Sequence, residues 1–234
     1  MRPRNEDRCG TAVCGEATTL VAVADGVSGY EAADVASAMA VDVTLGAFAE
    51  QDAAASLEVR LARAVQHANI SIYDKAMIVP ELRGMATTLT ALAIRGDRLA
   101  AAHVGDSRLY LVRGGRALQL TKDHRAGRNA LTRCVGRELI VPVDRITRPV
   151  APGDVFVLCT DGVHNVVPNE ALVVAARAPE PAEACRALVD AALARGADDN
   201  VTVAVVRIAG EPAPDDVAPR GLGQRLLGLV GRAR

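Results

Sequence analysis

The amino-acid sequence predicts a single α+β domain, and three observations indicate it. Short β-prone runs end at turns that contain Asp-Gly or Gly-Asp pairs. Two long stretches with helical spacing separate the first of these runs from the others. The chain has 234 residues, half of them hydrophobic, and is long enough to bury one sizeable core. Periodicity alone predicts a mixed α and β chain and does not give the arrangement of its layers.

The first part of the chain is expected to hold one strand and two helices. Residues 18–24 are apolar and rich in β-formers, and they end at Asp25-Gly26 as a strand ends in a turn. Ala, Val, Met and Leu recur at helical spacing in residues 31–50 and 53–76. Asp25 is therefore expected at the exit of a strand.

The middle of the chain is predicted to form an antiparallel meander, because four β-prone runs follow one another with glycine-containing turns between them. The runs cover residues 87–94, 98–104, 108–112 and 117–120. Two more strands and two helices complete the prediction. The strands cover residues 155–160 and 201–208, and the helices between them cover residues 170–177 and 182–195.

Charge, cysteine content and hydropathy exclude several classes of protein. The net charge of −1 gives no general attraction to nucleic acid or to an anionic membrane. The 5 cysteines are odd in number and lack C-x-x-C spacing, which argues against a disulfide framework or a zinc site. No apolar run approaches about 18 residues and no cleavable signal is visible, so we expect a cytoplasmic protein without a transmembrane segment.

Acidic clusters that are far apart in the sequence carry the functional signal. Each lies beside an apolar or β-prone run, and they are Glu6-Asp7, Asp25-Gly26, Asp161-Gly162 and Asp198-Asp199-Asn200. Carboxylates at strand ends can converge on a pair of divalent cations, because Mg²⁺ and Mn²⁺ prefer oxygen ligands. Such a pair of cations suits hydrolysis at phosphorus. Any one Asp-Gly pair alone would indicate only a turn.

Six motifs follow one another along the chain. They are Arg2-Pro3-Arg4-Asn5-Glu6-Asp7, Asp25-Gly26-Val27-Ser28-Gly29, Met85-Ala86-Thr87-Thr88, Val104-Gly105-Asp106-Ser107-Arg108, Cys159-Thr160-Asp161-Gly162 and Asp199-Asn200-Val201-Thr202. Their order resembles the PP2C-type (PPM) protein serine/threonine phosphatases of the compact bacterial kind, over roughly residues 2 to 207. The resemblance implies an αββα sandwich of two antiparallel sheets flanked by helices, which residues 1–208 would form.

The resemblance also implies a centre with two Mn²⁺ or Mg²⁺ ions and a metal-bridging hydroxide as the nucleophile. Asp25 would bridge the two ions. The Glu6 side chain and the Gly26 carbonyl would bind one ion, and Asp161 and Asp199 would bind the other.

Three further residues receive roles from the resemblance. Asp7 would orient metal-bound waters, and Arg2 would grip two phosphate oxygens with its planar guanidinium. Asp106 would help to hold a third, weaker ion, shared with Asp161. Asp198 is interpreted as a turn residue, since the ligand in the family directly precedes Asn. His164 is left outside the catalytic set, because nearness in sequence is its only link to the site.

The segment that forms a mobile flap in the family is nearly absent here. Thr121-Lys122-Asp123-His124 is joined to Leu131-Thr132-Arg133 by residues 125–130 alone. Flap loops contribute substrate contacts and gating, so a short flap predicts an open cleft and altered selectivity for protein substrates. Arg125 and Arg128 could contact phosphate, although solvated loop charges are the more common role for such residues.

The sequence therefore predicts a metal-dependent phosphatase acting on phosphorylated Ser and Thr proteins and reversing a cytoplasmic kinase. One alternative is a pseudophosphatase that binds phosphoproteins without turnover, because the flap is short and only Met1 precedes Arg2 where family members have a strand. A displaced Glu6 would favour that alternative. A phosphatase of the partner-switching type, acting on transcription regulators, is the other.

The C-terminal residues 209–234 differ in composition from the rest. A Pro- and Ala-rich linker is followed by leucines among arginines, a pattern that could form a short basic helix to dock a partner. Four glycines, Gly221, Gly223, Gly228 and Gly231, weaken any such helix, so a frayed tail is the other interpretation.

Overall fold

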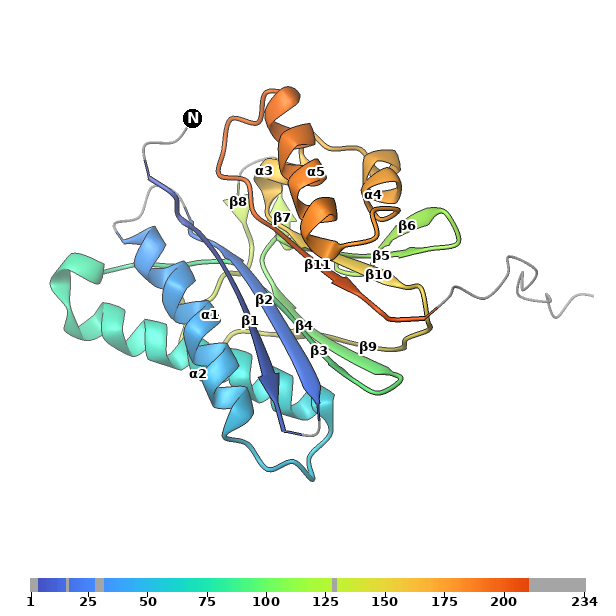
Figure 1. The fold of residues 1–234 in the computed structure, drawn as a ribbon. Helices are drawn as coiled ribbons and strands as arrows, with labels where there is room; N and C mark the ends of the chain where they lie inside the picture. Colours follow the sequence, from blue (N-terminus) through green and yellow to red (C-terminus); the bar gives the residue numbers. More distant parts are fainter. Residues whose placement is uncertain (1–3, 16, 28–31, 128–129, 211–234) are drawn as a thin grey trace, which may run out of the picture.

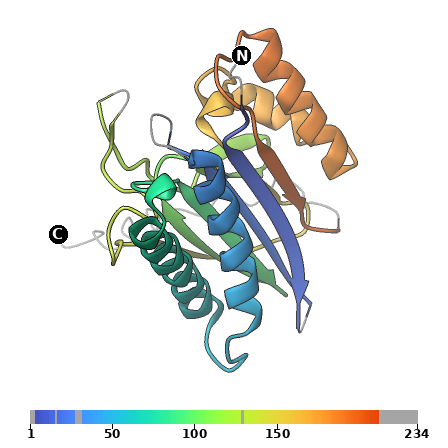
Figure 2. The same ribbon diagram turned by 90° about the vertical axis from the view of Figure 1, so that its left-hand side faces the viewer.

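Two antiparallel sheets lie face to face, and helices cover the outer face of each (Figures 1 and 2). The structure is a computed structural model and describes residues 4–15, 17–27, 32–127 and 130–210. The arrangement is the αββα sandwich that the resemblance implies. Arg2, Ser28, Gly29, Arg128 and the tail from residue 211 onward lie outside the described residues.

The first sheet has the strand order β1-β2-β3-β4-β9, and each neighbouring pair is antiparallel. Its strands are β1 (Asp7–Cys14), β2 (Thr18–Asp25), β3 (Leu89–Arg95), β4 (Arg98–Val104) and β9 (Asp144–Pro149). Its outer face is covered by α1 (Ala33–Ala49) and α2 (Leu57–Ile78), and the short 3₁₀ helix η1 (Pro80–Leu82) follows α2.

The second sheet has the strand order β11-β10-β5-β6. Its strands are β11 (Val203–Arg207), β10 (Val155–Cys159), β5 (Arg108–Arg113) and β6 (Arg116–Gln119). The helices on this side are α3 (Asp161–His164), α4 (Asn169–Ala175) and α5 (Pro181–Ala194). The segment expected in place of the flap forms only a small hairpin of β7 (Arg125–Ala126) and β8 (Ala130–Leu131).

The alternation of side chains along β2 shows why two layers of core form. Leu20 and Ala22 pack in the cluster beneath α1 and α2, whereas Val21 and Val23 point the other way into the space between the sheets. There they join Phe156 and other apolar side chains of the second sheet. Each large side chain buried in this way contributes about 1.5 to 3 kcal/mol relative to an exposed one.

The predicted meander is wrong in one respect, because its strands belong to two sheets. The pair β3 and β4 lies in the first sheet, and the pair β5 and β6 lies in the second. The chain crosses between the sheets at residues 105–107. Gly105 has φ 107 there, and a Cβ at this position would lie 2.6 Å from the Thr88 side chain, so only glycine fits. Asp106 consequently lies at the junction of the two sheets and not in a hairpin turn.

Several elements differ from the sequence prediction for local reasons. The pattern did not predict β1, whose residues are only half-buried or exposed at the edge of the first sheet, nor β9 and the four-residue α3. Helix α2 begins later than predicted, because Ser56 Oγ accepts a hydrogen bond from Val59 N at 3.4 Å and caps the helix there. In the part of the chain that the structure describes, no helix combines the length and apolar character needed to cross a membrane.

Candidate metal centre

The pairing of β1 with β2 brings the first two acidic clusters together. In this register Asp7 lies directly opposite Asp25. Gly26 N donates to the Glu6 carbonyl oxygen at 3.0 Å. Glu6 N in turn donates to Asn200 Oδ1 at 2.9 Å, which attaches the last acidic cluster to the same edge. Sheet register therefore places residues that are nearly 200 positions apart in sequence side by side.

The end of β10 brings Asp161 to the same place. Asp161 is the first residue of α3, and a Cβ on the following Gly162 would collide with the carbonyl oxygen of Asn200. The two backbone segments can pack this closely only because residue 162 is glycine. Thr160 Oγ1 donates to Asp7 Oδ2 at 2.8 Å and thereby joins the two sheets across the site.

The acidic side chains line one cavity of about 480 Å³. It is bounded by Asp25, Gly26, Val27, Thr88, Asp106, Arg125, Leu131, Asp161, Asn165, Asp198 and Asp199. Strand ends and junctions from both sheets thus contribute carboxylates to a shared space. Such an arrangement can bind cations and position an anionic substrate beside them.

Burial and mutual repulsion make these carboxylates costly to ionise without added positive charge. Burial raises the pKa of Asp7 to about 6. The pKa of Asp25 is raised well above its ordinary value, first by burial and then by repulsion from Asp7 and Asp161. The pKa of Asp161 is raised by burial and by the nearby Asp199. The cluster therefore favours the binding of cations that would compensate its charge.

The donor set fits hard divalent ions in its chemistry, since it consists of carboxylates and a backbone carbonyl. Asp7 Oδ1 is also buried without a hydrogen-bond partner among the described residues, as expected for an oxygen that faces a ligand sphere. Within those same residues, no three His, Cys, Asp or Glu side chains converge on one point as placed. The carboxylates line the walls of the cavity instead.

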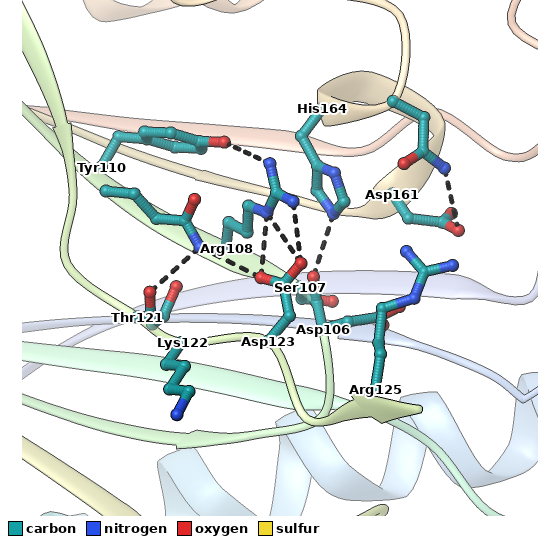
Figure 3. Close-up of polar contacts among 12 residues, drawn as sticks. Asp106, Ser107, Arg108, Tyr110, Thr121, Lys122, Asp123, Arg125, Asp161 and His164 are labelled. Carbon is teal, nitrogen blue, oxygen red and sulfur yellow. Dashed lines mark hydrogen bonds and ion pairs between the residues drawn. The ribbon is translucent and has the colours of Figure 1, made fainter. Parts of the chain in front are cut away.

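The Asp106 side of the cavity differs because it contains an arginine. Arg125 Nε lies 3.2 Å from Asp106 Oδ2, and the Arg125 side chain is only 21% exposed (Figure 3). Burial raises the pKa of Asp106 to about 6, and attraction from Arg125 opposes that rise. The interpretation of Arg125 as a solvated loop charge is therefore wrong.

Histidine and threonine side chains hold the backbone of the site. His164 Nε2 donates to the Asp106 carbonyl oxygen at 2.9 Å, and burial lowers the pKa of His164 to about 4, so the ring is neutral. Thr87 Oγ1 donates to the Asp25 carbonyl oxygen at 2.8 Å. Thr88 Oγ1 accepts from Asp25 N at 2.9 Å. Both threonines are buried beside the carboxylates.

Most of the residues singled out in the sequence meet at this cavity. Those that line it are Asp25, Gly26, Asp106, Asp161 and Asp199. Glu6 and Asp7 adjoin it through the hydrogen bonds of Gly26 and Thr160, and Arg2 lies outside the described residues.

Two lining residues were missed by sequence reasoning. Asp198 lines the cavity beside Asp199, although it was interpreted as a turn residue. Asn165 Nδ2 donates to Asp161 Oδ2 at 3.3 Å. Asn165 lies four residues after Asp161, and this spacing places the two side chains on the same face only if a helical turn begins at Asp161.

The sequence and structure are similar to those of named protein phosphatases. The chain is 33% identical over 208 residues to the serine/threonine protein phosphatase PstP of Mycobacterium tuberculosis, covering 81% of this chain and 40% of PstP. It is 33% identical over 229 residues to the serine/threonine phosphatase stp of Listeria innocua, covering 88% of this chain and 91% of stp. This chain therefore spans well under half the length of PstP.

The fold comparison agrees with these similarities. The catalytic domain of PstP, solved in complex with two manganese ions, superposes with a TM-score of 0.78 at 33% identity, over 90% of this chain and 94% of that one. The family model described as protein phosphatase 2C matches residues 3–197. Because that match covers most of the chain and includes the segments that carry Asp25, Asp106 and Asp161, the chain belongs to the protein phosphatase 2C family.

Proposed function

We propose that this chain is a metal-dependent protein phosphatase that hydrolyses phosphoserine and phosphothreonine. The observation that carries the proposal is the convergence of Asp25, Asp161 and Asp199, from separate segments of two sheets, on one cavity of about 480 Å³. The names of its relatives and the two manganese ions of the PstP structure support it.

The proposed ligand set is the one that the motifs imply. Asp25 bridges two Mn²⁺ or Mg²⁺ ions, Glu6 and the Gly26 carbonyl complete the first, and Asp161 and Asp199 complete the second. The raised pKa values of Asp25 and Asp161 support this assignment, because the ionised form of each carboxyl is unfavourable unless a cation lies beside it. When bound, the two ions would activate water and neutralise phosphate oxygens.

The chain's own groups have two further tasks in this proposal. Asp7 orients the reacting water, since Thr160 Oγ1 fixes its Oδ2 at 2.8 Å and leaves Oδ1 buried beside the site. Arg2, outside the described residues, grips two phosphate oxygens through its guanidinium. The small β7–β8 hairpin supports an open cleft in which substrate selectivity depends on few flap contacts.

The proposal extends to the partners and the boundaries of the domain. Phosphorylated Ser and Thr proteins are the substrates, a cognate kinase is the opposing enzyme, and nucleic acid is not a partner. The domain covers residues 1–208, and the tail 209–234 is either a segment that docks a partner or a frayed end. A cytoplasmic location is supported by the state of the cysteines, all of which are free thiols.

The pseudophosphatase alternative is not favoured by any observation on the described residues. That alternative predicts a displaced Glu6. The Glu6 backbone is instead held on both sides, by Gly26 N at 3.0 Å and by Asn200 Oδ1 at 2.9 Å.

The proposal is tested by phosphate release from a phosphothreonine peptide, with Mn²⁺ and with chelator. Asp25→Asn removes the bridging charge at nearly constant size, and we expect it to abolish both release and Mn²⁺ binding. Asp97→Asn is the matched control, because Asp97 is an exposed turn residue between β3 and β4. If the wild type binds Mn²⁺ but releases no phosphate, or if Asp25→Asn behaves as Asp97→Asn does, the proposed function is refuted.

A further inference from the structure

We propose that the Arg125 guanidinium serves as the third cation of this centre, so that the chain binds two divalent ions and not three. The inference rests on the proposed function, because it concerns the same carboxylates. It departs from the expectation that Asp106 and Asp161 share a weaker third ion. The Arg125 guanidinium already supplies positive charge to the Asp106 and Asp161 carboxylates.

The position of the guanidinium is the first argument. Arg125 Nε forms an ion pair with Asp106 Oδ2 at 3.2 Å. The guanidinium extends from there toward the Asp161 carboxylate (Figure 3). Both carboxylates line the same cavity as Arg125. The positive charge thus lies between the two groups that would have to converge on a third ion.

The rigidity of the supporting segment is the second argument. His124 N donates to the Gly105 carbonyl oxygen at 2.8 Å, and Gly105 N donates to His124 Nδ1 at 3.1 Å. The residue before Arg125 is therefore attached by two hydrogen bonds to the residue before Asp106. This reciprocal pairing fixes the distance between the Arg125 and Asp106 backbones, so their side chains meet without a large loss of conformational entropy.

A second contact joins the same two segments, one residue before His124 and three residues after Gly105. Arg108 Nε donates to Asp123 Oδ1 at 2.9 Å, and Arg108 Nη2 donates to Asp123 Oδ2 at 2.7 Å. This bidentate pair joins the start of β5 to the strand-free segment that leads into β7. The segment that carries Arg125 is consequently part of the site's framework and not a solvated loop.

A divalent ion at Asp106 would have to displace this arginine. An ion at contact distance from Asp106 Oδ2 would be repelled by the guanidinium already paired with that oxygen, and a side chain fixed in place loses less entropy than an ion taken from solution. A guanidinium keeps its charge at any physiological pH, so this compensation does not depend on the Mn²⁺ concentration. Removing the guanidinium should open Asp106 and Asp161 to an additional, weak ion.

The experiment is a Mn²⁺ titration of the full chain, followed by calorimetry and by the electron paramagnetic resonance signal of free Mn²⁺. We expect two bound ions in the wild type and three in Arg125→Ser, the third being weaker by at least about tenfold because it has fewer fixed ligands. Arg125→Gln keeps most of the side-chain length without the charge and should also bind three, which covers the case in which Arg125→Ser does not fold. Arg125→Lys should bind two.

Two controls make the result specific. Arg116→Ser removes the same charge from the exposed β5–β6 hairpin and should leave the number at two. Adding Asp106→Asn to Arg125→Ser should return the number of bound Mn²⁺ ions from three to two. The inference is overturned if the wild type binds three ions or if both neutral variants bind two. If those variants bind two ions but raise KM for the phosphopeptide about tenfold, Arg125 contacts the substrate phosphate instead.

Failure of the inference can be distinguished from failure of the proposed function. A wild type that binds three ions, and whose Mn²⁺ binding is abolished by Asp25→Asn, contradicts the role of Arg125 alone. A wild type that binds no Mn²⁺ contradicts the ligand assignment, and the role of Arg125 is then refuted with it.

Discussion

The two sides of the cavity differ in the source of the positive charge that compensates their buried carboxylates. On one side, Asp25 and Asp161 are crowded by other carboxylates, and burial and repulsion raise the pKa of both, although attraction from Arg125 partly opposes the rise at Asp161. On the other side, Asp106 is equally enclosed but is paired with Arg125 at 3.2 Å. The first side requires cations from solution, whereas the second carries its own.

The scaffold beneath the two sides is shared, so the difference lies in charge and not in architecture. Thr88 Oγ1 accepts from Asp25 N at 2.9 Å and hydrogen-bonds to Ser107 Oγ at 2.7 Å, next to Asp106. The buried Thr88 hydroxyl therefore holds the backbone on both sides of the cavity, at Asp25 and next to Asp106. The nearest cation therefore distinguishes a carboxylate that acts as a metal ligand from one that acts as an ion-pair partner.

The largest expected effect comes from substituting one carboxylate on each side. Asp161→Asn should weaken Mn²⁺ binding by more than about a hundredfold, since even groups that only orient metal ligands contribute about 10- to 100-fold. Asp106→Asn should weaken it by less than about tenfold, because Arg125 already neutralises that carboxylate. Calorimetric Mn²⁺ titration measures both. Equal losses in the two variants would remove the distinction between the sides.

The next effect concerns the stability of the chelator-treated protein at different pH values. The pKa of Asp7 is about 6 in the folded chain and 3.8 in the unfolded reference, so the folded state binds more protons between these values. The free energy of unfolding should therefore fall as pH rises from about 4 to about 7, by on the order of 2 kcal/mol for this group. Mn²⁺ should restore it at pH 7, because the ion binds the folded state.

Asp7→Asn removes that contribution, together with the repulsion by which Asp7 raises the pKa of Asp25. The variant lacks the titrating group, so the stability difference between it and the wild type should change with pH over the same interval. Asp123 and Asp144 have lowered pKa values and oppose the trend, but both are present in either protein and cancel in the difference. Urea unfolding in chelator at pH 5 and pH 7 measures it. A difference that is constant with pH would contradict the raised pKa of Asp7.

Sequence reasoning predicted the local elements and the carboxylates of the first side, for physical reasons. The apolar alternation of β2 and the helical spacing of α1 and α2 record burial directly, so these elements were identified. The αββα arrangement came from six ordered motifs and not from periodicity. The edge strand β1 was missed, because few of its side chains are buried and its pattern is correspondingly weak.

The second side of the cavity could not be predicted in the same way. The change of sheet at Gly105 depends on close contact with Thr88, which lies far away in sequence. The place of Arg125 depends on the hydrogen bonds between His124 and Gly105, which form only when the two segments meet. An arginine in a short loop carries no sign of these contacts, so a solvated charge was the default interpretation.

The smallest expected effect tests whether the first side depends on neutral groups as well as on charge. Asn165 is exposed and donates to Asp161 Oδ2 through a long hydrogen bond of 3.3 Å. Asn165→Ala should therefore weaken Mn²⁺ binding only about threefold, below the usual range for groups that orient a metal ligand. Mn²⁺ titration beside Asn169→Ala, at the exposed start of α4, measures the change. A loss as large as that of Asp161→Asn would show that Asn165 positions the carboxylate, and cation demand alone would no longer explain the first side.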